Sequence, residues 1–123
     1  AWLSPGMTVA SIGSTLPEQR EVDPETLNRA SMIVADMPEE VIEDTGDMIV
    51  ADQAGVGVAA KVVSLAGVIS GRHPGRGSAD DIVVYKSVGA GLQDLTVAAM
   101  CFHRAQEMGL GVTLPETIRP IVK

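Results

Sequence analysis

The residues best placed for chemistry in this sequence are Lys86 and Ser87, which lie between an apolar run and a glycine turn. The β-branched run at 82–85 predicts a buried strand, and Gly89-Ala90-Gly91 leads into a long helical pattern. The carboxyl ends of strands in a parallel α/β sheet present polar groups and backbone amides to a ligand. Lys86 and Ser87 are therefore either ligand contacts or the solvated end of a strand.

The turn Gly89-Ala90-Gly91 nearly completes the glycine fingerprint of a dinucleotide-binding loop, but Asp94 stands where the third glycine belongs. A carboxylate at that position would repel a pyrophosphate at the helix N-terminus, where the helix dipole favours an anion from the ligand. We therefore expect a helix start in which Asp94 satisfies first-turn amides, rather than a phosphate cradle.

A second cluster of small polar residues, Gly13-Ser14-Thr15, follows the strand-like run at 7–12. Its two hydroxyls could bind a cofactor or substrate, or could bond their own backbone in a turn. The basic patch Arg72-His73-Pro74-Gly75-Arg76 could reach an anion, or could simply be a solvated loop. Neither His73 nor His103 has a neighbouring nucleophile in the sequence, which gives no support to acyl-transfer chemistry.

Composition excludes several classes of function. The chain has 9 basic and 16 acidic residues, a formal charge of −7 and three aromatic residues, so we expect no nucleic-acid partner. No stretch is apolar and long enough to predict a membrane segment. We expect the single cysteine, Cys101, to be a buried residue on a helix. One cysteine cannot form an internal disulfide, which fits a reducing, cytoplasmic setting. No group of residues has the spacing of metal ligands.

The elements that must position these residues alternate between strand and helix, which predicts an α/β fold. We expect about three parallel strands with flanking helices on both faces and a long C-terminal helix. Such a sheet leaves two exposed edges, and the first residue is Ala rather than Met, so we expect further strands to precede Ala1. The expected elements are strands at 7–12, 32–35 and 82–85, helices at 24–30, 38–47 (ended by Gly46), 58–66 and 91–108, and a tail at 113–123.

Three stretches, in this order and spacing, carry a resemblance to a known family. They are Gly13-Ser14-Thr15-Leu16-Pro17-Glu18-Gln19-Arg20-Glu21-Val22-Asp23, Thr45-Gly46-Asp47, and the run from Asp80 through Lys86-Ser87-Val88-Gly89 to Leu92-Gln93-Asp94. Together they make the chain similar to the ornithine cyclodeaminase/μ-crystallin family. The resemblance implies that residues 1–112 are the C-terminal half of an NAD(P)-binding Rossmann domain, with helix 91–108 leading back to a dimerisation domain. It also implies a homodimer, NAD or NADP as the cofactor, and a small amino or imino acid as the substrate.

The resemblance also assigns site residues. It implies that a loop lines the nicotinamide, that Gln19 replaces a cofactor-contacting lysine of some members, that Ser87 contacts the cofactor and that Val88 lies near the substrate. The nicotinamide loop consists of Ile12, Gly13, Ser14 and Thr15.

Thr15 departs from the family pattern, because cyclodeaminases carry a catalytic Asp there. A threonine hydroxyl is too weak a base to replace that carboxylate at neutral pH. The resemblance therefore favours an imine reductase or amino-acid dehydrogenase over a true cyclodeaminase. We expect the chain alone to be inactive, because the glycine-rich phosphate loop and the substrate clamp would lie upstream. The alternative is a non-catalytic binding or oligomerisation module.

Overall fold

The computed structural model describes residues 2–114, which form two units divided between Ala90 and Gly91. The first unit is an α/β domain, and the second contains the helix α5 (Gly91–Glu107). Most of the predicted tail, residues 115–123, lies outside the described residues. No helix in the described part of the chain is long and apolar enough to cross a membrane.

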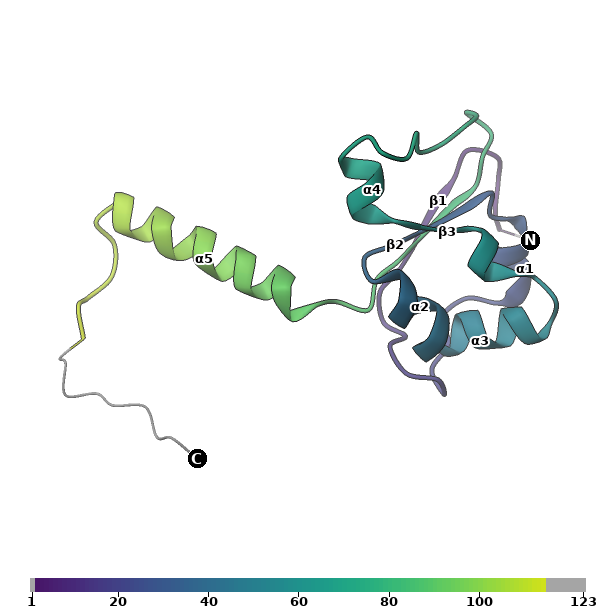
Figure 1. Cartoon of the computed structure of the whole chain (residues 1–123), viewed down its shortest axis with the longest axis horizontal. Helices are drawn as coiled ribbons and strands as arrows, with labels where there is room; N and C mark the ends of the chain where they lie inside the picture. Colours follow the sequence, from purple (N-terminus) through teal and green to yellow (C-terminus); the bar gives the residue numbers. More distant parts are fainter. Residues whose placement is uncertain (1, 115–123) are drawn as a thin grey trace. The chain divides into compact units, whose positions relative to one another are not determined.

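The α/β unit is built on a parallel sheet with the strand order β1-β4-β2-β3 (Figure 1). Ser11 of β1 and Ala35 of β2 both lie in register with Lys86 of β4. The carboxyl ends of these three strands therefore meet along one edge, and the predicted α/β class is confirmed. The strands are β1 (Thr8–Ser11), β2 (Met32–Ala35), β3 (Val62–Ser64) and β4 (Val83–Lys86).

Helices cover both faces of this sheet. Helices α1, α2 and α3 lie on one face, and the short helix α4 lies on the other (Figure 1). Asp23 caps α1 by accepting a hydrogen bond from the Thr26 amide, and Pro24 opens the helix, as the sequence predicted. The bounds are α1 (Pro24–Arg29), α2 (Pro38–Asp44), α3 (Gly46–Gln53), the 3₁₀ turn Val58–Ala60 and α4 (Leu65–Ile69).

Two apolar clusters form the core because strand side chains alternate between the faces of the sheet. The larger cluster packs alternate residues of β2 and β4 against α1, α2 and α3, and consists of Leu27, Ala30, Ile33, Ala35, Val41, Met48, Ala51, Val58 and Val84. The smaller cluster packs Met32, Val34 and Val83 against residues that include Leu65 and Val68 of α4. Lys86 lies two residues after Val84, so it shares the face that the larger cluster occupies.

The stretch 58–66, which we expected to be helical, instead holds the 3₁₀ turn, strand β3 and the start of α4. Val62 and Val63 are β-branched, and β3 pairs with Ile33, Val34 and Ala35 of β2. Pairing with a central strand overrides the local helical spacing of apolar residues.

Gly46 begins α3 and does not end α2, which contradicts the sequence-based expectation. Helix α2 ends at Asp44, and the next residue, Thr45, has an extended backbone. The glycine serves a close packing contact, described below, and not a helix stop.

The second unit agrees with its sequence pattern. Helix α5 begins at Gly91 with Asp94 in its first turn, as expected for a helix start. Gly109 ends the helix in the left-handed conformation (φ 65°), and the Leu110 amide reaches back to the Ala105 carbonyl. The apolar side chains of α5, Cys101 included, are exposed within this unit, so the expectation of a buried Cys101 is wrong for the described residues.

Ile33 is fully buried at the centre of the sheet. An Ile33→Ala variant should lower the free energy of unfolding by about 2–5 kcal/mol. The matched Ile69→Ala variant removes the same atoms from a side chain that is 77% exposed, and should stay within about 0.5 kcal/mol of the wild type. Urea unfolding followed by circular dichroism compares the two, and equal losses would contradict this core.

Candidate functional site

Loops that follow β1, β2 and β4 converge at the carboxyl edge of the sheet. The loop after β1 contains Ser14 and Thr15, β2 is followed by Asp36, and β4 is followed by Ser87 and Val88. The structure thus brings together the two segments that the sequence singled out, although they are far apart along the chain.

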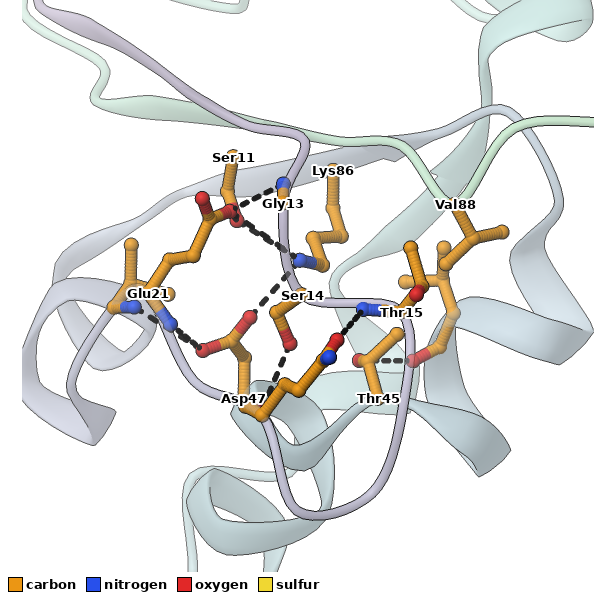
Figure 2. Close-up of polar contacts among 12 residues, drawn as sticks. Ser11, Gly13, Ser14, Thr15, Glu21, Thr45, Asp47, Lys86 and Val88 are labelled. Carbon is orange, nitrogen blue, oxygen red and sulfur yellow. Dashed lines mark hydrogen bonds and ion pairs between the residues drawn. The ribbon is translucent and has the colours of Figure 1, made fainter.

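Lys86 lies at the centre of this edge with its side chain fully buried. Its ammonium is 2.9 Å from a carboxylate oxygen (Oδ2) of Asp47 and donates a 2.9 Å hydrogen bond to the Ser11 hydroxyl (Figure 2). The carboxylate of Glu21 lies 3.8 Å away. Because the ammonium is enclosed by protein groups, Lys86 is not a solvated strand end, and a ligand cannot reach it directly.

Asp47 connects Lys86 to Glu21 and Val22, which follow the loop after β1 (the β1 loop). The carboxylate is in the first turn of α3, where the helix dipole favours a negative charge. While Oδ2 faces Lys86, Oδ1 accepts hydrogen bonds from the amides of Glu21 (2.7 Å) and Val22 (3.1 Å). One buried carboxylate therefore holds both the ammonium and the end of the loop.

Glu21 closes the loop by reaching back to its beginning. Its Oε2 accepts a 2.7 Å hydrogen bond from the Ser11 hydroxyl and a 2.8 Å bond from the Gly13 amide (Figure 2). A side chain on Gly13 would overlap this carboxylate and would force the Glu21 side chain to move. Ser11, Gly13 and Glu21 thus join the two ends of the loop.

Several polar groups of this loop form hydrogen bonds within it. Ser14 is buried and its hydroxyl donates to the Gln19 carbonyl at 2.8 Å, so this hydroxyl holds the turn. The Gln19 side-chain oxygen accepts a 3.0 Å bond from the Thr15 amide. Ile12 (67% exposed) and Thr15 remain on the surface of the edge.

Gly46 allows the loop to pack directly on the start of α3. Its amide donates to the Leu16 carbonyl at 3.1 Å. A Cβ at this position would overlap the carbonyl oxygens of Pro17 and Gln19. This close approach explains why a glycine stands at a helix start, where sequence reasoning took it for a helix stop.

Asp36 holds the second segment of the edge. Its carboxylate accepts hydrogen bonds from the Ser87 hydroxyl (2.6 Å) and from the amides of Val88 (3.2 Å) and Gly89 (2.9 Å). Two amides at the start of this turn, those of Val88 and Gly89, are therefore bonded to a carboxylate of the protein.

These contacts shift the acidity of the three carboxyl groups. Burial raises the pKa of Asp47, but hydrogen bonds from Lys86, Val22 and Glu21 outweigh burial and leave this pKa below its ordinary value. The pKa of Asp36 is lowered in the same way, with burial opposed by hydrogen bonds from Ser87 and nearby amides. The Ser11 hydroxyl is the main cause of the lowered pKa of Glu21.

The basic patch lies away from this edge, in the loop that precedes β4. The Arg76 guanidinium donates to the Thr8 hydroxyl (2.8 Å) and to the Asp81 carbonyl. The His73 ring accepts a 3.1 Å bond from the Gly75 amide. These contacts hold the loop, which connects α4 to the amino end of β4 and does not contribute to the candidate site.

Sequence reasoning did not single out the acidic residues that organise the edge. Glu21 and Asp47 stood within recognised motifs, and Asp36 followed a predicted strand, but none was given a role. The sequence feature that could have identified Asp36 is its position directly after a strand, because polar site residues in parallel sheets lie at the carboxyl ends of strands. The resulting edge supplies exposed contact surface and fixed loops, and it suits binding and orientation better than proton transfer by Lys86.

Comparisons with known proteins agree on one family. Residues 1–109 match the model of the ornithine cyclodeaminase/mu-crystallin family. Delta(1)-pyrroline-2-carboxylate reductase of Bacillus cereus is 34% identical over 110 residues, which are 89% of this chain and 34% of the relative. The chain thus spans about a third of the length of the curated relatives it matches.

Two solved structures illustrate the similarity of the fold. A probable ornithine cyclodeaminase from Bordetella pertussis is 41% identical with a TM-score of 0.79, over 90% of this chain and 36% of the other. The Delta(1)-pyrroline-2-carboxylate reductase of Thermococcus litoralis, in complex with NADH and L-proline, is 30% identical with a TM-score of 0.83. That match covers 92% of this chain and 35% of the other.

A Gly46→Ala substitution should displace the loop that packs on α3 and lower the free energy of unfolding by about 1–3 kcal/mol. Gly67→Ala is the matched control, because a Cβ there meets only Ser64 Cβ at 3.8 Å. That control should be stabilising by about 0.5–1 kcal/mol, since alanine favours a helix. Urea unfolding measures both, and a Gly46→Ala variant as stable as the wild type would refute the close packing.

The Lys86–Asp47 ion pair should also make stability depend on pH. Folding lowers the pKa of the Asp47 carboxyl below its ordinary value, so this group stabilises the fold fully above that ordinary pKa, and the stabilisation is lost as the pH falls through the lowered pKa. Asp47→Asn should cost up to about 3–5 kcal/mol at neutral pH, because the buried Lys86 ammonium loses its nearest carboxylate and keeps only Glu21 at 3.8 Å.

The same Asp47→Asn variant should lose less of its remaining stability than the wild type between about pH 5 and pH 2. Asp52→Asn, which changes an exposed carboxylate on the same helix, is the control for the change in net charge. Unfolding free energies across this pH range test the prediction, and parallel curves for wild type and Asp47→Asn would show it to be wrong.

Proposed function

The chain belongs to the ornithine cyclodeaminase/mu-crystallin family, and from this premise we propose that it forms the nicotinamide side of an NAD(P)-binding site. The whole enzyme would transfer hydride between the nicotinamide and a small amino or imino acid. The observation that carries this proposal is the meeting of the 12–15 loop and the 87–88 segment at the carboxyl edge of the sheet. Ligands of open parallel sheets bind outside that edge.

The chemistry of the edge fits the nicotinamide end of the cofactor better than its pyrophosphate. The Val88 and Gly89 amides are bonded to the Asp36 carboxylate, which disfavours a phosphate there. Exposed Ile12 and Thr15 would provide contact surface for a ring and its neutral amide. A bound nicotinamide dinucleotide would supply or accept the hydride, and the protein would supply orientation.

Individual roles follow from these contacts. Ile12 and Thr15 would line the cofactor, and Val88 would face the substrate. Gly13, Ser14 and Gln19 would act by shaping the loop, because each is bonded within it. Ser87 would offer its hydroxyl oxygen to the cofactor while donating its proton to Asp36.

We favour reduction of an imine, or the reverse oxidation of an amino acid, over cyclodeamination. Thr15 carries no carboxylate that could activate water, and Lys86 is enclosed by protein. Reduction of a preformed C=N bond needs a bound substrate, a positioned cofactor and a proton source, and does not need a carboxylate at position 15. We also propose a homodimer, as the family resemblance implies. The single cysteine is the basis for a proposed cytoplasmic setting.

The test is an assay of the protein encoded by the complete reading frame that contains this chain. We expect it to oxidise NADH or NADPH when given a cyclic imino acid, and to release no ammonia from ornithine. The 123-residue chain alone should show no turnover. Ammonia release from ornithine without imine reduction would contradict the proposal.

A Thr15→Ala variant tests the role of that residue in the same enzyme. If Thr15 only contacts the cofactor, kcat for imine reduction should fall by less than about tenfold. A general acid–base group contributes about 10²–10⁴-fold, so a loss of that size would make Thr15 a proton-transfer residue and contradict its proposed role.

A further inference from the structure

We propose that Lys86 is a positioning residue of the cofactor site: together with Asp47, Glu21 and Ser11 it holds the 12–20 loop in its binding shape without touching the ligand. The proposal rests on the proposed function, because it assumes that this loop lines the nicotinamide. Its consequence is that a fully buried ammonium controls the affinity for the cofactor.

The enclosure of Lys86 is the first step of the argument. Its side chain is 0% exposed, and so is that of Asp47. An ammonium has three donors, and here Asp47 and Ser11 lie at 2.9 Å while Glu21 lies at 3.8 Å. Each of these groups belongs to the protein, so a direct role as a nucleophile or as a ligand for phosphate is excluded.

The second step is the position of these partners along the chain. Ser11 is the last residue of β1, where the loop begins, and Glu21 stands where the loop returns. Asp47 binds the amides of Glu21 and Val22, while Glu21 binds the Ser11 hydroxyl and the Gly13 amide. Lys86 therefore lies where both ends of the loop are fastened, as Figure 2 shows.

Removal of the ammonium leaves two neighbouring carboxylates, Asp47 and Glu21, without a cation between them. Like charges that share a site repel each other, and an unpaired buried carboxylate is costly. Glu21 is the more exposed of the two, so repulsion would move its carboxylate away from the Ser11 hydroxyl and the Gly13 amide, and the two ends of the loop would separate.

The middle of the loop has anchors that do not depend on Lys86. The Gly46 amide bonds the Leu16 carbonyl, and Gln19 bonds the Thr15 amide. A protein without Lys86 should therefore sample the binding shape of the loop less often, and should not lose it altogether.

This expectation separates affinity from turnover. When only a fraction of molecules is competent to bind, the apparent dissociation constant increases by the inverse of that fraction. Once the cofactor saturates the enzyme, the loop is held in place and the chemistry proceeds. A positioning role therefore raises the KM for the cofactor and leaves kcat nearly unchanged.

The test uses Lys86→Met in the complete enzyme, with steady-state kinetics of imine reduction. We expect the KM for NAD(P)H to rise about 10- to 100-fold while kcat stays within about threefold. Lys61→Met is the matched control, because Lys61 also bonds protein groups, the carbonyls of Leu27 and Asn28, but away from the loop. Its KM should stay within about twofold of the wild type.

A milder pair of variants keeps the test valid if Lys86→Met fails to fold. Ser11→Ala removes one member of the same network and should raise the KM for NAD(P)H by about 3- to 10-fold. Ser31→Ala removes a hydroxyl that bonds the Ile82 carbonyl and should leave this KM unchanged.

Three results would overturn the proposal. One is an unchanged cofactor KM in Lys86→Met or in Ser11→Ala. Another is an equal rise in the control variants, which would indicate general destabilisation. The third is a loss of kcat at saturating cofactor with an unchanged KM, which would place Lys86 in the chemistry. A wild-type enzyme that does not bind NAD(P)H would instead refute the proposed function itself.

Discussion

The buried ion pair between Lys86 and Asp47 is the interaction on which the arrangement of the carboxyl edge depends. Removing both charges from water is expensive, and further hydrogen bonds to the two groups offset part of that cost. Ser11 and the amides of Glu21 and Val22 provide those bonds. The ion pair thereby joins β4, β1, α3 and the loop after β1. The groups that bind the Lys86 ammonium therefore also fix the position of this loop.

Two carboxylates at this edge accept hydrogen bonds from backbone amides, and these bonds limit which ligands the edge can bind. Asp47 fastens the β1 loop and Asp36 fastens the turn after β4. Amides used in this way are not offered to a phosphate. An edge with fixed loops and an exposed Ile12 and Thr15 is better suited to a flat ring such as nicotinamide than to the negatively charged pyrophosphate.

Local patterns in the sequence predicted the elements whose stability is local. Asp23 and Pro24 identified the start of α1, and the pattern after Gly91 identified α5 with nearly its observed ends. Strand β3 was missed because it is only three residues long and depends on pairing with β2.

The candidate site was predictable only in part, for a similar reason. Its two loops could be found because polar residues follow apolar strands. The bond between Ser87 and Asp36, 51 residues apart, and the pair between Lys86 and Asp47 depend on strand order, which local spacing does not reveal. Gly46 was misread as a helix stop because its actual constraint, the close passage of Pro17 and Gln19, is also a tertiary contact.

Amide hydrogen–deuterium exchange of the complete enzyme, with and without NAD(H), tests the central claim most directly. That claim is that the carboxyl edge of this sheet lines the nicotinamide. The account predicts that the cofactor slows exchange in two segments together, the loop at 12–19 and the turn at 87–89. The account would be contradicted if protection were confined to the loop at 70–77, which lies between α4 and β4, and both carboxyl-edge segments were unchanged.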